Sequence, residues 1–264
     1  MSKVPQFTAH NIVLPDGTMT IPGKPVLAES DQAKAALRAL DLIFPADARV
    51  GKRIIDLGCL EGGYTVEFAR AGFDSLGIEV RDVNIAKCNY VATALGLPNL
   101  RFAQDDVRNV ERYGQFDAIF CSGLLYHLDR PTEYLHTLAK VTTRALILQT
   151  HYATRRRPPR WRTYPPYRIS RLVRHEGNLG RWVHEYSPRA KQEKVEGAVW
   201  ASFGNPRSFW IEKKHLLQTL REVGFPLVFE QYDFLTNIVA DRYIHDNHRS
   251  LFVAVRPVGD RMPR

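Results

Sequence analysis

Two acidic residues, Asp56 and Glu79, end short apolar segments on either side of a glycine-rich stretch, residues 58–63. Glycines let the backbone turn tightly between a strand and a helix, and the N–H groups of such a turn can approach a ligand closely. An acid about twenty residues after a turn of this kind is placed to accept hydrogen bonds from a ribose diol. The stretch 53–84 therefore predicts the nucleoside-binding half of a doubly wound α/β fold.

The order of residues in the turn discriminates between nucleoside ligands. Asp56 stands just before Gly58, and Glu61 lies inside the turn, before Gly62. Two carboxylates would repel the pyrophosphate that a G-x-G-x-x-G turn holds, but they suit a ligand with an ammonium group. The stretch resembles motif I of the class I S-adenosylmethionine (SAM) methyltransferases, usually D-x-G-x-G-x-G, with Leu60 in place of the second glycine. This resemblance implies that SAM is the cofactor.

Strand and helix signals alternate along the chain as a parallel sheet requires. Strands are expected at 53–57, 74–80, 100–107, 116–128 and 144–153. Helices are expected between them at 64–71, 82–95 and 131–140, and later at 215–225. Two final strands, 227–234 and 250–257, have no helical pattern between them and should pair antiparallel. This order predicts an α/β fold: a doubly wound, seven-stranded Rossmann-like methyltransferase sheet with a terminal antiparallel strand pair and a cap insertion. A nicotinamide-dependent dehydrogenase would instead continue the βαβ alternation.

The whole chain, residues 1–264, is expected to form one domain. Residues 1–45 should hold a β-hairpin (10–22) and an amphipathic helix (30–44) capped by Ser30. Residues 46–150 form the SAM-binding half and 205–264 the C-terminal helix and antiparallel strands. Between them, residues 151–204 form a basic and aromatic cap insertion.

The net charge of +9 is concentrated in that insertion. Residues 155–174 hold eight arginines and no acid, so the rest of the chain carries only +1. Tryptophan, tyrosine and proline are interleaved with these arginines. The segment could be a stacking platform for single-stranded RNA, a substrate lid whose arginines pair with an anionic group, or a solvated loop.

Cysteine usage and hydropathy indicate the class of protein. Cys59, Cys88 and Cys121 show neither a disulfide framework nor metal-ligand spacing. The first residues lack the apolar core of a signal peptide, and no apolar run is long enough to span a membrane. We therefore expect a soluble, cytoplasmic protein without a metal site or membrane partner.

Ligands of open α/β sheets bind beyond the carboxyl ends of the strands, so the strand ends supply the candidate site. The methyltransferase resemblance implies that Asp56 and the turn residues Gly58, Cys59, Glu61 and Gly62 hold the methionine moiety. It implies that Glu79 binds ribose and that Asp106, with the N–H of Val107, binds adenine. Asp105 is the alternative to Asp106. Cys121 and Ser122 should line the methionine side, with Cys121 packing rather than acting as a nucleophile.

The run GLLYHLDRP, residues 123–131, resembles the loop after strand four in tRNA wobble-uridine carboxymethyltransferases and their relatives. In those enzymes the loop tyrosine helps to recognise a carboxylated SAM derivative; neither that cofactor nor the tRNA substrate is carried over here. The resemblance covers roughly residues 30–150 and 205–257. It also implies a substrate-facing turn that contains Asn205, Arg207 and Trp210.

Methyl transfer from SAM is an in-line displacement in which the enzyme positions the nucleophile and removes its proton. Histidine suits proton removal at neutral pH, which makes His127 and His151 the candidate general bases and Tyr126 a candidate contact. We therefore expect SAM-dependent O-methylation of a small polar metabolite, such as a sugar or a secondary-metabolite precursor. A tRNA-modifying transferase with RNA bound through residues 155–174 and a non-catalytic SAM-binding protein are the alternatives.

Overall fold

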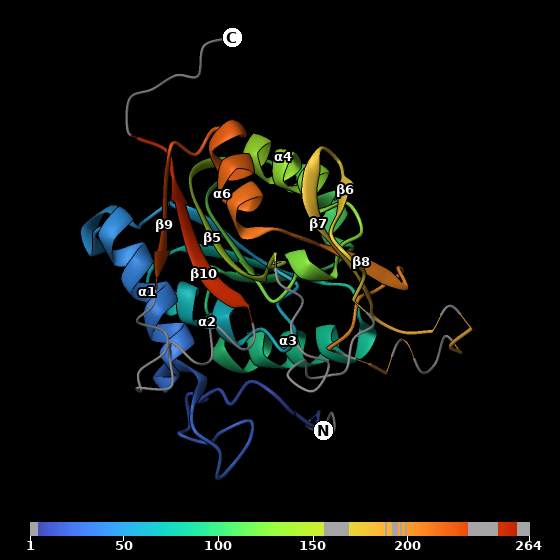
Figure 1. The fold of residues 1–264 in the computed structure, drawn as a ribbon. Coiled ribbons are helices and arrows are strands. Elements are labelled where there is room, and N and C mark those ends of the chain that lie inside the picture. The colour runs from blue at the N-terminus through green and yellow to red at the C-terminus, as the bar shows by residue number, and fades with distance from the viewer. Residues whose placement is uncertain are drawn as a thin grey trace.

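The computed structural model describes residues 5–155, 169–187, 200–231 and 248–257, together with 189–191, 195, 197 and 198. A seven-stranded sheet with the order β3-β2-β1-β4-β5-β10-β9 forms its centre (Figure 1). The strands are β1 Arg53–Leu57, β2 Asp74–Glu79, β3 Leu100–Gln104, β4 Phe116–Ser122, β5 Thr142–His151, β9 Leu227–Gln231 and β10 Arg249–Val255. The first five are parallel, whereas β10 runs antiparallel between β5 and β9. The predicted sheet and its terminal antiparallel pair are confirmed.

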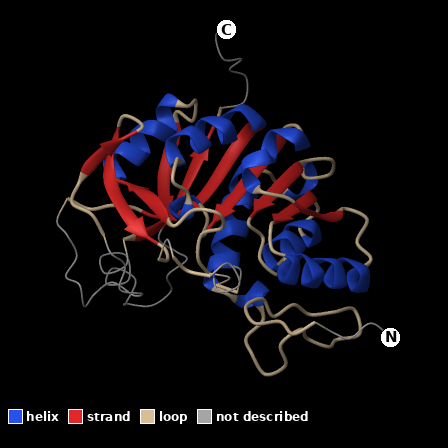
Figure 2. Ribbon diagram, turned by 90° about the vertical axis from the view of Figure 1, so that its right-hand side faces the viewer, coloured by secondary structure: helices blue, strands red, loops and turns tan. Residues whose placement is uncertain are grey.

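Helices cover both faces of this sheet (Figure 2). They are α1 Asp31–Ile43, α2 Gly63–Arg70, α3 Asp82–Leu95, α4 Pro131–Val141 and α6 Lys213–Glu222. Short 3₁₀ helices are η1 Leu27–Glu29, η2 Ala46–Ala48, η3 Val107–Tyr113 and η4 Leu125–His127. Ser30 caps α1 as predicted, by accepting a hydrogen bond from the N–H of Ala33.

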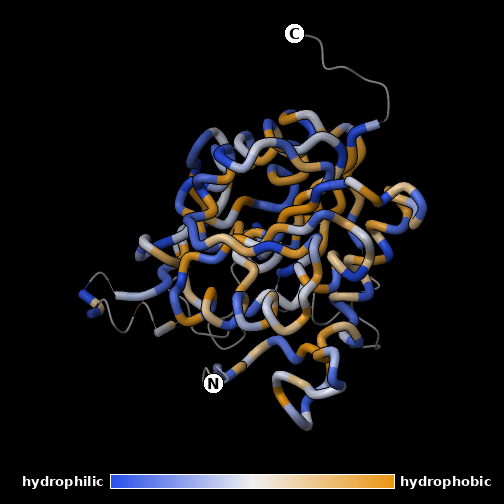
Figure 3. Tube along the Cα trace, turned by 180° about the vertical axis from the view of Figure 1, so that it is seen from behind, coloured by the Kyte–Doolittle hydropathy of each residue, from blue (hydrophilic) through white to orange (hydrophobic). Residues whose placement is uncertain are grey.

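Alternate residues of the buried strands pack into two hydrophobic cores, one on each face of the sheet. Ile54 packs with α1 and α2 on one face, and the next residue, Ile55, packs with α4 and α6 on the other. Hydrophobic residues accordingly run along the central strands (Figure 3). Strands buried on both faces have nearly continuous apolar sequences, which is why the sheet is readable from the sequence.

A second, three-stranded antiparallel sheet was not predicted. It consists of β6 Val173–His175, β7 Asn178–His184 and β8 Arg207–Ile211, in that order. Phe209 and Ile211 of β8 belong to the same hydrophobic core as α4 and α6. Arg207 and Trp210 therefore lie in a strand paired with β7 and not in the predicted turn, whereas their contact with a substrate stays a prediction.

Two further expectations need correction. The predicted strand 116–128 ends at Ser122, because Gly123 has a φ of +73° and the chain then turns into η4. The predicted hairpin 10–22 is reduced to a single bridge between Val13 and Met19. The RNA platform or lid predicted for 155–174 falls largely outside the described residues, because 156–168 are not among them.

Candidate functional site

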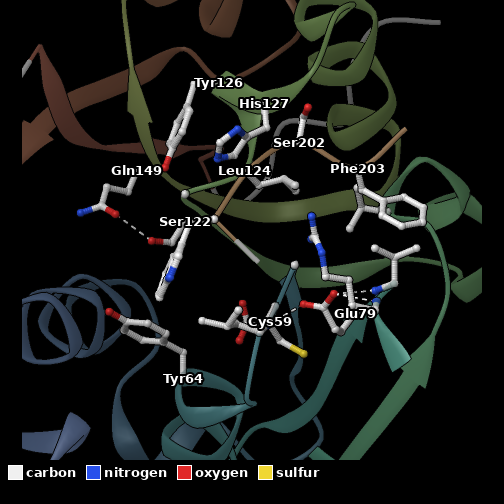
Figure 4. A pocket seen from close by; sticks show the side chains of 18 of the residues that line it. Cys59, Tyr64, Glu79, Ser122, Leu124, Tyr126, His127, Gln149, Ser202 and Phe203 are labelled. Carbon is white, nitrogen blue, oxygen red and sulfur yellow. Dashed lines mark hydrogen bonds between the residues drawn. The ribbon is translucent and has the colours of Figure 1, made fainter. Parts of the chain in front are cut away.

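A cavity of about 410 Å³ lies beyond the carboxyl ends of β1, β2 and β4. Its lining comes from the glycine-rich turn, the ends of β2 and β4, the loop that contains η4, and residues of the cap and the N-terminus. Tyr126 and His127 enter it from one side, and Cys59 and Glu79 face them from the other (Figure 4). The structure thus brings together strand ends that are far apart in sequence, as the sheet topology requires.

The turn reaches the glycine-type conformation despite its leucine. Leu60 has a φ of +55°, and its N–H donates to Oε2 of Glu79 at 3.0 Å. Gly62 has a φ of +80°, and a Cβ at this position would lie 2.6 Å from the ring of Phe102. Gly62 is outside the cavity lining, so it shapes the turn, whereas Gly58, Cys59 and Leu60 line the cavity.

Asp56 is almost wholly buried and lines the cavity. Its Oδ2 accepts a hydrogen bond of 2.7 Å from the hydroxyl of Thr65 on α2. Burial raises the pKa of Asp56 to about 7, and the nearby carboxylate of Glu79 acts in the same direction. No cation among the described residues pairs with Asp56, and a buried carboxyl in this state is suited to a cationic ligand group.

Glu79 joins the turn to the end of β2. Besides the N–H of Leu60, it accepts hydrogen bonds from the N–H groups of Val80 and Arg81, both at 2.9 Å. Burial raises the pKa of Glu79 above its usual value, although these hydrogen bonds oppose the shift. A carboxylate has about four acceptor sites, so one remains for a hydroxyl in the cavity.

The position of Glu61 differs from the prediction that it helps to hold the methionine moiety. Its fully buried carboxylate turns away from the cavity and accepts the N–H groups of Thr8, Ala9 and His10, and it pairs with Lys87 at 2.7 Å. Although burial alone would raise the pKa of Glu61, the hydrogen bonds from His10 and Lys87 lower it to about 2. The carboxylate therefore anchors the N-terminal segment and does not meet a ligand ammonium group.

The two candidate acids after β3 separate clearly. Asp106 lines the cavity with Val107, and it caps η3 by accepting the N–H of Arg108 at 2.9 Å. Asp105 is outside the lining and bonds to Asn109 and Tyr113. The hydrogen bond from Asn109 lowers the pKa of Asp105. Of the two acids, Asp106 is therefore the one placed to contact a ligand in the cavity.

Of the two residues expected at the end of β4, only one reaches the cavity. Ser122 lines it and donates to Oε1 of Gln149 at 2.9 Å. Cys121 is buried in the core, and burial raises the pKa of its thiol to about 12. Packing, rather than nucleophilic chemistry, is the role that this environment supports.

His127 and Tyr126 line the cavity, whereas His151 is outside the lining. His151 lies behind Tyr126, with ring centroids 4.6 Å apart, and stacks on Trp210 at 4.7 Å. Nε1 of Trp210 donates to the carbonyl of Tyr126 at 2.9 Å. Trp210 therefore supports the η4 loop from outside the cavity.

The other predicted substrate residues also have structural contacts. Asn205 lines the cavity, but its side-chain nitrogen donates to the carbonyl of His127 at 2.8 Å, and its oxygen accepts from Arg108 at 3.1 Å. Arg207 lies outside the lining, with its guanidinium 4.3 Å from the ring of Trp182. Their substrate contacts stay predictions without support from this geometry.

Sequence reasoning did not single out Arg249, Ala9 or His10 in the cavity wall, whereas Trp200 and Phe203 belong to the aromatic stretch 198–205, which has the composition of a pocket cover. Arg249, at the start of β10, donates to Oε1 of Gln149 at 2.8 Å and lies over the ring of Tyr126. Trp200 and Phe203 line the cavity from the cap, next to Arg81. Ala9 and His10 reach it from the N-terminus. None of these residues stands at the end of a parallel strand, and that was the criterion used to find candidates.

In the part of the chain that the structure describes, no cluster of three or more His, Cys, Asp or Glu residues is placed to hold a metal ion. No helix there has the length and apolar character to span a membrane.

The sequence matches the family described as "Methyltransferase domain" over residues 28–228. The ubiquinone biosynthesis O-methyltransferase of Acinetobacter baumannii (strain AYE) is 30% identical over 88 residues, which cover 33% of this chain and 37% of that protein. The tRNA U34 carboxymethyltransferase of Pseudomonas aeruginosa (strain LESB58) is 32% identical over 107 residues, 38% of this chain and 32% of that protein. The aligned stretches therefore span only about a third of these relatives.

Solved structures resemble a much larger share of the chain. The N-terminal domain of EvdMO1, determined in the presence of SAH and D-fucose, matches with a TM-score of 0.64 and 23% identity, over 92% of this chain and 88% of that chain. CalS10 with SAM bound, an amino pentose methyltransferase from Micromonospora echinaspora, matches with a TM-score of 0.51 and 18% identity, over 87% and 92% of the two chains. At these identities the likeness shows the fold, which is the Rossmann-like sheet of methyltransferases.

Proposed function

Because this chain belongs to the methyltransferase domain family and is a SAM-dependent methyltransferase, we propose that it methylates an oxygen of a small polar metabolite, with His127 as the general base. The observation that carries this proposal is the cavity itself. It holds two buried acids at the ends of β1 and β2, and a histidine faces them from the η4 loop.

Each end of SAM has a complementary group in the proposed arrangement. The carboxylate of Asp56 accepts the ammonium group of the methionine moiety, and Glu79 accepts a ribose hydroxyl. Asp106 accepts the exocyclic amino group of adenine, with the N–H of Val107 available to the ring. Support comes from the burial of both strand-end acids and from their positions in the lining.

The methyl group then passes from sulfur to an acceptor oxygen. Bound SAM would supply the methyl group, its carbon–sulfur bond breaking as the carbon–oxygen bond forms and the thioether leaving uncharged, and His127 would take the acceptor proton. General-base assistance of this kind contributes about 10²–10⁴-fold. His127 is preferred over His151 because only His127 lines the cavity.

A sugar-like acceptor is supported by two observations. EvdMO1 was studied with D-fucose, and CalS10 is an amino pentose methyltransferase. Trp200 and Phe203 of the cap and the adjacent Asn205 line the cavity of about 410 Å³, which favours a small acceptor over a large one.

The first test is calorimetric titration with SAM, followed by a screen of free sugars for SAH release. Asp56→Ala and Glu79→Ala should each weaken SAM binding by at least about tenfold, the equivalent of ~1.4 kcal/mol. His127→Ala should lower turnover and leave SAM affinity nearly unchanged. Unchanged affinity in both acid variants would refute the cofactor arrangement, and full turnover in His127→Ala would refute the base.

tRNA modification is the second candidate, favoured by the match to the Pseudomonas carboxymethyltransferase and by the eight arginines of residues 155–174. Tight tRNA binding that weakens steeply with salt would support it over a sugar acceptor. A SAM-binding protein without turnover is the third, and methylation of any acceptor would exclude it.

A further inference from the structure

We propose that Glu185, directly after β7 in the cap, is a positioning residue that holds the imidazole of His127 in the tautomer required for proton removal. The inference rests on the proposed function, because it concerns the base of that reaction. It is based on a contact between a residue next to the cap sheet, Glu185, and a residue that lines the cavity, His127. Nδ1 of His127 lies 2.9 Å from Oε1 of Glu185 across 58 residues of sequence.

The carboxylate of Glu185 is held rigidly. Its side chain is only 3% exposed, and the hydroxyl of Ser208 on β8 donates to the same Oε1 at 2.7 Å. The N–H of Glu185 donates to the carbonyl of Pro206 at 3.0 Å, so the backbone is fixed as well. A buried carboxylate with two donors on one oxygen has little freedom to leave Nδ1.

The imidazole is held from its own side too. The N–H of His127 donates to the carbonyl of Leu124 at 2.8 Å, and its carbonyl accepts from Asn205. The side chain is 12% exposed and lines the cavity. Backbone and ring nitrogen together therefore determine where the second nitrogen, Nε2, points.

The chemistry of the pair fixes the proton. A carboxylate can only accept a hydrogen bond, so Nδ1 of neutral His127 must donate and Nε2 carries the lone pair. Nε2 is then the atom that takes the acceptor proton, and the carboxylate stabilises the imidazolium that forms. This carboxylate–histidine arrangement gives a role to a buried acid that is outside the cavity lining.

The test uses the full-length protein labelled with ¹⁵N-histidine, without any acceptor. Long-range ¹H–¹⁵N spectra of wild type should show His127 protonated at Nδ1, and Glu185→Gln should shift it towards the Nε2–H tautomer, because an amide can donate as well as accept. A wild-type spectrum with the proton on Nε2 would overturn the proposal, even if every variant failed to fold.

Kinetics with the sugar that the acceptor screen identifies provide the second readout. Glu185→Gln should lower kcat by about 10–100-fold with KM and SAM affinity unchanged, and it should add nothing to the loss in His127→Ala. Glu176→Gln is the matched control. Glu176 is a nearly buried carboxylate of the same cap sheet, but its oxygens accept the N–H groups of Thr132 and Glu133 at the start of α4. This control should lose stability and keep kcat.

The outcomes separate this inference from the proposed function. A slow His127→Ala with a normal Glu185→Gln refutes the role of Glu185 alone. Normal turnover in both variants refutes His127 as the base and the inference with it. Equal kcat losses in Glu185→Gln and Glu176→Gln would also overturn it, since both effects would then be structural.

Discussion

Asp56 is a buried carboxyl in the cavity lining, and its pKa lies far above its usual value. Burial raises its pKa to about 7, so a large share of the Asp56 carboxyl groups in the free protein is protonated at neutral pH. In the proposed arrangement the ammonium group of SAM lies beside Asp56, favours the charged carboxylate and lowers this pKa, so SAM binding should release a proton at and below pH 7. Burial also raises the pKa of Glu79, against the hydrogen bonds from the N–H groups of Arg81, Val80 and Leu60.

SAM affinity should therefore fall as the pH drops below 7, approaching about tenfold per pH unit, and level off above pH 8. Calorimetry across this range, in buffers of different ionisation enthalpy, measures both the affinity and the released proton. In Asp56→Asn, binding should be weaker and its pH dependence flatter. An affinity that is constant between pH 6 and pH 8 would contradict the assignment of Asp56 as the ammonium acceptor.

Leu60 and Glu61 show how far residue types can be interpreted from sequence. The turn and its two strand-end acids could be predicted, because their spacing reflects local geometry. Leu60 adopts the left-handed conformation that glycine usually supplies, and nothing local reveals this. Glu61 was assigned to the ligand because the N-terminal segment that uses its carboxylate is some fifty residues away in the chain.

At the scale of elements, Glu61 and Lys87 fix the N-terminal segment to α3 and the glycine-rich turn. This pair is buried, and its carboxylate also accepts three backbone N–H groups of residues 8–10. His10 of this segment accepts the N–H of Gly63 at 3.0 Å through Nδ1, and burial lowers its pKa to about 4. The segment is thus built around a charged carboxylate and a neutral histidine.

Glu61→Gln should lower the free energy of unfolding by about 3–5 kcal/mol, because Lys87 is left buried without a counter-charge. Urea denaturation measures the loss. Glu111→Gln is the control: its pair with Lys140 is largely exposed, so the change should cost no more than about 1 kcal/mol. Similar losses in the two variants would show that the Glu61 anchor is unimportant.

A helix or strand could be predicted where its own residues carry the pattern that defines it. The parallel strands and α3 follow from continuous apolar runs and from helical spacing. The cap sheet β6-β7-β8 has short, aromatic strands interrupted by polar residues, and it acquires its identity by packing on the core of α4 and α6. Such tertiary dependence leaves little signal in a single sequence.

At the scale of the whole molecule, the cap and the cofactor half are tied together across the cavity. Nη2 of Arg81, just after β2, donates to the carbonyls of Ala201 at 2.9 Å and Ala198 at 3.3 Å. Its guanidinium also lies 5.5 Å from the ring of Phe203. Cap position and the cofactor site should therefore be coupled.

Arg81→Ala should speed SAM dissociation by about tenfold, because the cap loses its attachment next to the predicted ribose site. Stopped-flow displacement of bound SAM measures this rate. Arg70→Ala, which removes a pair with Glu67 and a hydrogen bond to the carbonyl of Val13 outside the cavity lining, should leave the rate unchanged. A normal rate in Arg81→Ala would mean that the cap does not retain SAM.

The direction of β10 has a practical consequence for finding the acceptor. This strand starts at Arg249, which lines the cavity, and runs antiparallel to β5. Its last residue, Val255, therefore pairs with Ala145 near the amino end of β5, away from the cavity. An immobilisation tag attached after this strand would leave the cavity open to a library of sugars. A tag at the N-terminus would instead be joined to the segment whose Ala9 and His10 form part of the cavity wall. Surface-based ligand capture should therefore use the C-terminal attachment.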